Sequence, residues 1–327
     1  MTRPALAAAR ATEILDFLAS HPGESFTLSE ISRGLDLNMA SGLSILKALT
    51  DAGYVHRHHS HKTYSLGAAL VALGQAALTR HPVIDLAREE MRRLAEECAT
   101  ECVASVVVGD DIVIVAASGR PRAEGADVRV GQRIPMIPPL GPIFLAWEDE
   151  DRIEHWLDAL GPDGDDAERR HYREALDMVR RRGFSLGLES GARERMGSAL
   201  IDLVNVPTNE RLRREVVGLI AALRHDYEVI DLESTAGHPI SNMAAPVFGP
   251  DGDVVMGLTL QGFGRPMTGP EIDSLAERLV SATLQVTRAS GGHAPSDAQR
   301  VVTRRASPTS LSVECSRSIP GPPPTNQ

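Results

Sequence analysis

Four histidines fall within six consecutive positions near the N-terminus, at His56, His58, His59 and His61. Neutral imidazoles are common metal ligands, and an imidazole with a pKa of about 6.5 changes its charge close to neutral pH. A metal site also needs fixed geometry and partners that orient its ligands, and no cysteine or acidic residue lies close by in sequence. We therefore expect an exposed turn without a metal, whose protonation would increase its attraction for a polyanion.

Two further groups of residues offer chemistry of a different kind. Cys98 and Cys102 are four residues apart at the expected end of a helix, so their thiols could face each other in a redox sensor. A reactive thiol needs a lowered pKa and access to solvent, and burial as a structural thiol is the commoner role. The acidic runs 148–151 and 163–166 could hold a metal, but carboxylates also favour the first turn of a helix, which is the role we expect.

The charge of the chain is distributed unevenly. The 327 residues suffice for two domains and carry a formal net charge of −10. Residues 1–81 hold seven Lys and Arg against six Asp and Glu, residues 82–290 hold 23 against 36, and residues 291–327 hold four against two. The acidic middle block would be repelled by nucleic acid, whereas the N-terminal segment would not. Three scattered cysteines, no membrane-length apolar run and no apolar signal segment predict a cytoplasmic protein.

The N-terminal segment carries the signals of short helices followed by a hairpin. A capping box at Thr27–Glu30 predicts the start of one helix, and Asn38 predicts the cap of a helix that runs to about residue 51. Residues 54–57 and 62–66 predict two strands joined by the histidine-rich turn. Helix, tight turn, helix and hairpin indicate a winged helix-turn-helix, a fold that places one helix in the major groove of DNA.

The helix that follows Asn38 supplies the expected DNA-reading face. Its spacing places Met39, Leu43, Leu46 and Thr50 on one side, and Ser41, Ser44 and Ala48 on the opposite side. Small polar side chains and free amides at helix starts suit phosphate oxygens, and cations of the helix and hairpin suit the DNA backbone. The expected DNA-binding residues are Thr27, Ser29, Asn38, Ala40, Ser41, Ser44, Lys47, Arg57 and Lys62.

Downstream segments predict a linker, a second domain and a tail. After a DNA-binding domain at 5–67, the Ala- and Leu-rich stretch 68–81 predicts a linker helix. Strands and flanking helices over 82–290 predict an α+β sensor domain, and the fold class of the chain is therefore α+β. Residues 291–327, rich in Ser, Pro and Arg, predict a disordered tail.

Several stretches of the chain match a known group in order and spacing. They are ATEILDFLASHPGESFTLSEISRGLDL, LTDAGYVHR and KTYSLGAALVALG in the first domain, and VGQRIPMIPPLGPIFLAW, RRRGFSLGLES and AAPVFGPDGDVVMGLTL in the second. In these stretches the chain resembles the IclR-type transcriptional regulators. The resemblance implies a winged helix-turn-helix, a linker helix and a GAF-like domain that binds a small effector. It also implies a homodimer or homotetramer that most often represses transcription at a double-stranded DNA operator.

The chain departs from this family in two places that bear on function. About 40 extra residues form an insertion at about 187–235, which predicts helices over 192–204 and 208–225 and a short extended piece over 227–232. Members of the family often carry Lys and Arg in the DNA-reading helix, where this chain has Met39 and Ser44. Because arginine is the commonest reader of guanine, we expect discrimination to depend on Asn38, Ser41, Ser44 and DNA shape.

The resemblance also implies an effector pocket in the second domain. Its expected wall is a Gly- and Pro-rich loop around residues 136–141, and its lining is expected to be mostly apolar. An apolar pocket with few polar groups suits an aromatic or short organic acid, and Arg133 could pair with the acid. The expected effector-binding residues are Ser105, Val107, Arg133, Met136, Pro139, Leu140, Gly141, Asn242 and Met243.

Two other function classes remain open from the sequence. We identify no G-x-S-x-G elbow, no phosphate-binding loop and no H-E-x-x-H motif, and we expect no catalytic residues, cofactor or metal. A small-molecule-binding or enzymatic domain with a vestigial helix-turn-helix is the alternative, which the missing arginine favours. A DNA-binding architectural protein with no ligand is a third possibility.

Overall fold

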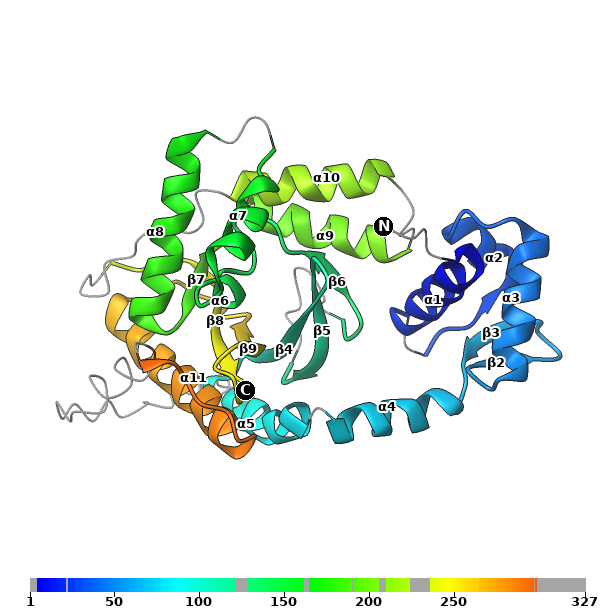
Figure 1. Ribbon diagram of the computed structural model, residues 1–327, viewed down its shortest axis with the longest axis horizontal. Coiled ribbons are helices and arrows are strands. Elements are labelled where there is room, and N and C mark those ends of the chain that lie inside the picture. The colour runs from blue at the N-terminus through cyan, green and yellow to red at the C-terminus, as the bar shows by residue number, and fades with distance from the viewer. Residues whose placement is uncertain are drawn as a thin grey trace, which may run out of the picture.

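The computed structural model describes residues 5–21, 23–80, 82–120, 129–161, 165–189, 191–205, 210–223, 236–296 and 298. These residues form a small N-terminal lobe and a larger lobe built around a six-stranded sheet (Figure 1). Helix α4 (Ala69–Arg80) joins the lobes along one side. A helical hairpin of α9 (Gly191–Asn205) and α10 (Glu210–Ala221) extends from the larger lobe toward the smaller one along the other side.

The small lobe contains α1 (Leu6–Ala19), β1 (Phe26–Thr27), α2 (Leu28–Gly34), α3 (Met39–Asp51), β2 (Val55–His58) and β3 (Thr63–Leu66). The strands pair antiparallel in the order β1-β3-β2, and fully buried residues such as Ile14, Ile31 and Leu46 join the helices in one core. Thr27 and Asn38 cap α2 and α3 as predicted. The order of elements confirms the winged helix-turn-helix.

The connection between the lobes changes character at residue 81. No residue of α4 is buried, and Val71 and Leu73 are 66% and 51% exposed. The next helix, α5 (Pro82–Cys98), buries Met91 and Leu94 in the core of the larger lobe. Its outer side carries ion pairs such as Arg92 with Glu89 at 2.5 Å. The predicted linker helix is therefore present as α4, and none of its side chains belongs to the hydrophobic core of either lobe.

The sheet of the larger lobe has the order β6-β5-β4-β9-β8-β7, with every neighbouring pair antiparallel. Its strands are β4 (Glu101–Val108), β5 (Asp111–Ser118), β6 (Arg133–Pro135), β7 (Ser185–Leu188), β8 (Ile240–Phe248) and β9 (Val254–Gln261). Met243 and Ala245 of β8 pack with α5 and α11 (Gly269–Ala289). Ala244, between them, packs with a cluster that contains α6 (Pro142–Leu145), α7 (Glu150–Asp158) and α8 (Asp166–Arg182). Because side chains alternate along a strand, the two helical groups cover opposite faces.

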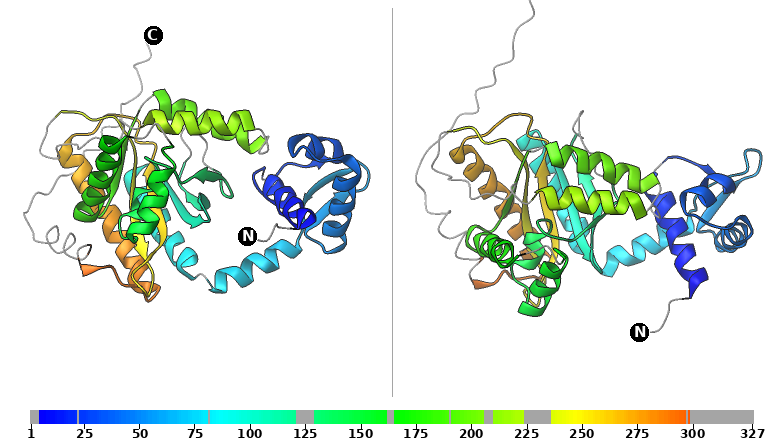
Figure 2. Two further views of the ribbon diagram at one scale, coloured as in Figure 1. Left: turned by 45° about the horizontal axis from the view of Figure 1, so that its top comes forward. Right: turned by 90° about the horizontal axis from the view of Figure 1, so that it is seen from above.

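The α9–α10 hairpin forms a separate small core against the edge of the sheet. Met196 and Leu200 of α9 pack with Val216 and Ile220 of α10 and with Leu140 of the loop before α6. Figure 2 shows the hairpin reaching toward α1 in both of its views. Both predicted helices of the insertion are present, while the predicted extended piece at 227–232 and most of the predicted tail lie outside the described residues. Among the described helices, none combines the length and the apolar content needed to cross a bilayer.

Candidate functional site

The outward side of α3 differs from the prediction. Gly42, Leu46 and Leu49 are the residues that α3 buries, whereas Met39 and Leu43 are 47% and 48% exposed. The predicted division of α3, with Met39 and Leu43 on the side of Leu46, is therefore not the division between its buried and exposed residues. The buried stripe is centred on the Gly42 side, since Gly42 lies so close to α2 that a Cβ atom there would meet the Ser32 hydroxyl at 3.0 Å. Ala40, Ser41, Ser44, Lys47 and Ala48 are also exposed.

The helix starts of α2 and α3 are fixed by their own side chains. The Glu30 carboxylate accepts from the Thr27 amide at 2.7 Å, and the Thr27 hydroxyl accepts from the Glu30 amide at 3.3 Å. The first of these bonds, with the bond from the Thr27 hydroxyl, lowers the pKa of Glu30. Asn38 Oδ1 accepts from the Ala40 amide at 2.9 Å. Thr27 and Asn38 therefore hold the two helices in position, and Ser29 is exposed beside them.

The hairpin β2–β3 presents cations beside α3. Arg57 and Lys62 are exposed, and the Arg57 guanidinium lies 5.8 Å from the centre of the buried Tyr64 ring. A hollow between α3 and β2 is lined by Leu43, Lys47 and Arg57 among others. His58 and His61 stack with ring centres 4.6 Å apart. Within the described part of the chain, no group of three or more His, Cys, Asp or Glu side chains has the arrangement of a metal site.

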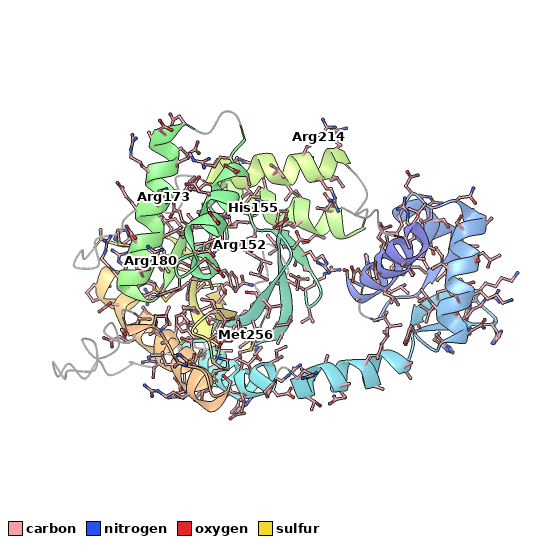
Figure 3. All side chains as sticks on the ribbon, viewed as in Figure 1. Arg152, His155, Arg173, Arg180, Arg214 and Met256 are labelled. Atoms are coloured by element: carbon pink, nitrogen blue, oxygen red, sulfur yellow. The ribbon has the colours of Figure 1, made fainter. Side chains whose placement is uncertain are left out.

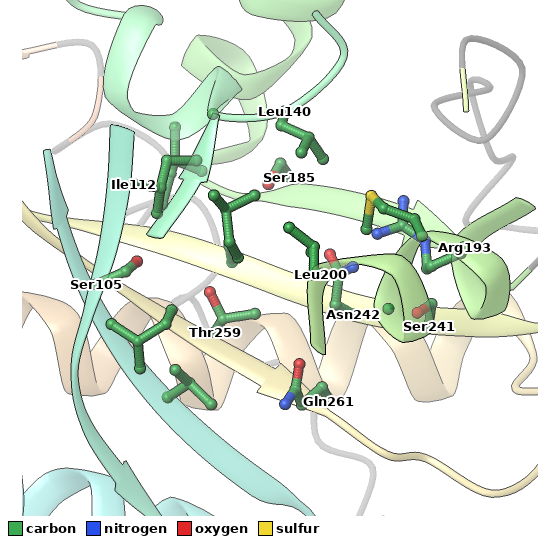
Figure 4. A pocket seen from close by; sticks show the side chains of 18 of the residues that line it. Ser105, Ile112, Leu140, Ser185, Arg193, Leu200, Ser241, Asn242, Thr259 and Gln261 are labelled. Carbon is green, nitrogen blue, oxygen red and sulfur yellow. The ribbon is translucent and has the colours of Figure 1, made fainter. Parts of the chain in front are cut away.

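A cavity of about 210 Å³ lies in the larger lobe, between the sheet, α6 and α9 (Figure 4). Ile112 and Ile114 of β5, Ile143 and Phe144 of α6, and Leu200 of α9 supply apolar walls. Helix α6 approaches β9 closely because position 257 is a glycine, where a Cβ atom would come within 2.5 Å of the Ile143 Cδ1 atom. The volume and lining suit one small, mostly apolar ligand.

Polar groups of the cavity gather on the side of β7, β8 and α9. Arg193 Nε donates to the Leu188 carbonyl at 3.1 Å. A Cβ atom on Gly187 would lie 2.9 Å from both the Arg193 Nη2 and the Asn242 Nδ2 atoms, so a glycine is required there to leave room for both side chains. Figure 4 shows Arg193, Asn242 and Ser241 on the same side, with Gln261 below them. A guanidinium with neighbouring amides and hydroxyls can bind a carboxylate.

Four of the predicted effector-binding residues line this cavity. They are Ser105, Leu140, Gly141 and Asn242. Ser105 stands at a bulge of β4, where the register with β5 shifts. The Trp156 indole holds the loop in place, since it donates to the Leu140 carbonyl at 3.0 Å. The other five predicted residues are not among the lining: Val107, Arg133, Met136, Pro139 and Met243.

For three of these five residues, their contacts explain why they do not line the cavity. Met243 is fully buried on the opposite face of β8 from Asn242, with α5 and α11. Met136 lies beneath Gly141, where a Cβ atom would meet the Met136 Cγ atom at 2.7 Å. Arg133 lies on the outside of β6, with its guanidinium 3.5 Å from Asp111 and 3.7 Å from Asp16 of α1.

Sequence reasoning missed the contribution of the insertion to the cavity. Arg193, Met196, Gly197 and Leu200 of α9 all line it. Their spacing of three and four residues is that of one helix face, which marked them as one surface. Nothing in the sequence indicated that this surface packs over the open end of a sheet whose strands come from distant segments.

A second cavity, of about 310 Å³, lies between the two lobes. Asp16 and Phe17 of α1 line it on one side, and Leu200, Leu203 and Val217 of the hairpin line it on the other. Burial raises the pKa of Asp16, and the nearby Arg133 opposes this rise. Leu200 lines both cavities. Helix α9 is therefore a shared wall, with the cavity of the larger lobe on one side and the surface of α1 on the other.

Other candidate chemistry has structural explanations. Burial raises the pKa of the Cys102 thiol to about 12 and that of Cys98 in the same direction, which disfavours reactive thiolates. In the first acidic run, Asp149 caps α7, and Glu150 pairs with Arg173 at 2.5 Å. Arg173 lies on α8 (Figure 3). These contacts match the predicted capping role.

The G-x-S-x-G spacing does occur once in the sequence, although it forms no nucleophile elbow. Residues 183–187 have the spacing G-x-S-x-G, with Ser185 at its centre. Gly183 ends α8 in a left-handed conformation and Ser185 begins strand β7, where it pairs with Ala244. A nucleophile elbow runs from strand to helix, and this segment runs from helix to strand, so the spacing is coincidental.

Comparisons with known proteins agree with the two-lobe architecture. A family model described as "IclR helix-turn-helix domain" matches residues 7–59, and one described as "Bacterial transcriptional regulator IclR C-terminal" matches residues 75–192. A curated relative, the Pca regulon regulatory protein of Pseudomonas putida, is 28% identical over 133 residues, which are 40% of this chain and 45% of the relative. The match thus spans less than half of that relative.

Solved structures show the same fold. The IclR transcriptional regulator of Alicyclobacillus acidocaldarius has a TM-score of 0.59 and 21% identity, over 88% of this chain and 100% of that chain. An IclR homolog from Microbacterium hydrocarbonoxydans, solved with 4-hydroxybenzoate, has a TM-score of 0.57 and 17% identity, over 87% and 100%. The second family match ends at residue 192, close to the start of α9, so most of the hairpin lies outside it.

Proposed function

The chain belongs to the IclR family of bacterial transcriptional regulators, and on this premise we propose that it binds operator DNA and that a small organic acid changes its affinity for that DNA. The observation that carries the proposal is the presence, in one chain, of an exposed α3 face and a separate, mostly apolar cavity. The enzymatic alternative is not favoured, because both family matches are to domains of transcriptional regulators.

DNA binding is assigned to α3 and the β2–β3 hairpin. Ala40, Ser41 and Ser44 are exposed on α3 and are proposed to meet the major groove. Lys47, Arg57 and Lys62 are proposed to contact phosphates, and their contribution would fall as salt rises. Thr27, Ser29 and Asn38 lie at the starts of α2 and α3, where helix amides favour phosphate oxygens.

The effector is assigned to the cavity beside α9. The cavity of about 210 Å³ has a mostly apolar lining with polar groups on one side, which suits an aromatic or short organic acid. The structural neighbour solved with 4-hydroxybenzoate supports this class of ligand. We assign the carboxylate to Arg193 rather than to Arg133, because Arg193 lines the cavity and Arg133 lies outside it.

The shared wall of α9 offers a route from the effector to DNA. A ligand changes DNA affinity only if it binds two conformations unequally. Leu200 contacts the space of both cavities, and a shift of α9 would therefore change the surface offered to Asp16 and Phe17 of α1. A coupling of about 1–3 kcal/mol is typical of such linkage.

A homo-oligomer and repression complete the proposal. The exposed Val71 and Leu73 of α4 are apolar surface of the kind that a second copy covers in a symmetric assembly. Two copies would present their α3 helices to half-sites about one helical turn apart. Binding to chromosomal DNA would place the protein in the cytoplasm. Protein bound to an operator that overlaps a promoter would repress transcription from that promoter.

In vitro selection tests the proposal directly. The purified full chain selects duplexes from a random library at near-physiological salt with non-specific competitor. We expect an inverted-repeat site, and we expect one of a panel of hydroxybenzoic and short aliphatic acids, 4-hydroxybenzoate included, to raise the melting temperature. Folded, oligomeric protein that enriches no site, with or without these acids, would overturn the proposal.

A further inference from the structure

Of the side chains that read bases by paired hydrogen bonds, the exposed face of α3 carries one, Lys47, which is proposed to contact phosphates instead. Arginine and lysine read guanine in this way, and asparagine and glutamine read adenine. The helix sequence MASGLSILKALTD contains no arginine, asparagine, glutamine or glutamate. The cap residue Asn38 uses its Oδ1 atom on the Ala40 amide, so it does not present a free paired edge.

Large apolar side chains stand on this helix instead. Met39 and Leu43 are one helical turn apart, and each leaves nearly half of its surface exposed. Leu43 borders the hollow between α3 and β2, together with Lys47 and Arg57. Cations that suit phosphates thus lie beside an apolar patch. In a complex with DNA, the cations would face the phosphate backbone and the apolar patch would face the groove.

The only apolar group that base pairs present in the major groove is the C5 methyl of thymine. We infer that Met39 and Leu43 read thymine methyl groups in each half-site, an inference that rests on the proposed function. The operator would then carry thymines at the positions that face the first two turns of α3. This recognition needs no charge, so it would depend little on salt, whereas the contacts of Lys47, Arg57 and Lys62 would depend on it strongly.

Deoxyuridine provides the test, because it pairs as thymine does but lacks the methyl group. The best duplex from the in vitro selection is remade with deoxyuridine at one half-site thymine at a time. Its dissociation constant is measured by fluorescence anisotropy with wild-type protein and with the Met39→Ala, Leu43→Ala and Ser44→Ala variants. Ser44→Ala is the control for the deoxyuridine penalty alone. It removes an exposed polar group that is itself proposed to meet the groove, so it can weaken binding overall while the penalty for the missing methyl group stays in place.

We expect at least one deoxyuridine per half-site to weaken wild-type binding about fourfold, which corresponds to about 0.8 kcal/mol for one buried methyl-sized group. The penalty should be the same at low and at physiological salt. It should nearly vanish in Met39→Ala or Leu43→Ala, and persist in Ser44→Ala. Unequal penalties of this kind would identify the pair in contact.

Several results would overturn the inference. One is a selected site without thymines opposite α3, another is deoxyuridine that binds as well as thymidine, and a third is a penalty that survives in both apolar variants. A loss of oligomer in Leu43→Ala by sedimentation velocity would assign the patch to contact between copies. Failure of the selection itself is a separate result, because it removes the proposed function, whereas the outcomes above leave that function intact.

Discussion

The DNA-facing side of α3 and the cavity of the larger lobe are built in opposite ways. The α3 face comes from one helix of 13 residues, and the exposure of Met39 and Leu43 follows from what the rest of that helix buries. The cavity draws on β4, β5, α6, β7, β8, β9 and α9, which are far apart in sequence. One region is therefore sensitive to local changes, and the other depends on how distant segments meet.

The largest expected effect separates the two sides of α3. Leu46→Ala should destabilise the small lobe by about 2–5 kcal/mol, because the fully buried side chain leaves a cavity. Leu43→Ala should change stability by no more than about 0.5 kcal/mol, because its side chain is half exposed. Hydrogen exchange of small-lobe amides measures both. Similar losses in the two variants would mean that Leu43 is packed in solution.

This contrast also explains what the sequence could and could not predict. The capping box at Thr27 and the cap at Asn38 depend on neighbours two or three residues away, and both were predicted correctly. The predicted faces of α3 do not coincide with its buried and exposed sides, because they were derived from the spacing of residue types alone. Periodicity counts residue types, but a surface that binds a ligand can itself be apolar.

The cavity lining was predicted only in part, for a different physical reason. Ser105, Leu140 and Asn242 line it, but Met243 does not, since one step along β8 reverses the face. Arg193 was missed because its place depends on how the inserted hairpin packs against the sheet edge. Such contacts are long-range, and no local pattern encodes them.

The second prediction concerns the cation of the cavity. Arg193→Gln should weaken binding of the best acid from the panel by about 10- to 100-fold, since hydrogen bonds to charged groups contribute about 1.5–3 kcal/mol. Arg133→Gln is the matched control and should leave acid binding unchanged, because Arg133 lies outside the cavity. Isothermal titration calorimetry measures both. The reverse order of effects would return the carboxylate to Arg133.

The third prediction tests the shared wall between the cavities. Leu200→Ala should reduce the effect of the acid on operator affinity by about 0.5–2 kcal/mol, while the operator affinity of the acid-free protein changes less. Met196 lines the cavity of the larger lobe but not the cavity between the lobes. Met196→Ala should therefore change the affinity for the acid more than it changes the coupling between acid and operator. Anisotropy titrations with and without acid give the coupling. An equal effect of both variants on coupling would argue that α9 is not the route.

The smallest expected effect compares two capping boxes, one in each region. Glu271 at the start of α11 accepts from Arg265 at 2.6 Å and from the Thr268 amide at 2.8 Å, and these bonds lower its pKa to about 2. Glu30 at the start of α2 is lowered by the Thr27 amide and hydroxyl, without an arginine hydrogen bond. A carboxyl whose folded pKa is depressed adds stability above its ordinary pKa of 4.5, and that stability is lost as pH falls toward the folded value.

Glu271→Gln should therefore lower the melting temperature of the larger lobe at pH 7, and the difference from wild type should shrink as pH falls from about 4.5 toward 2. Because the Glu271 side chain is 40% exposed and its ion pair is screened by solvent, the loss should be small, about 1 kcal/mol or less. Glu30→Gln should act on the small lobe alone, and Glu271→Gln on the larger lobe alone, when hydrogen exchange is followed in each. A difference from wild type that grows on acidification would contradict the depressed pKa of Glu271. A carboxylate with a depressed pKa stabilises the fold more above pH 4.5 than between pH 4.5 and 2.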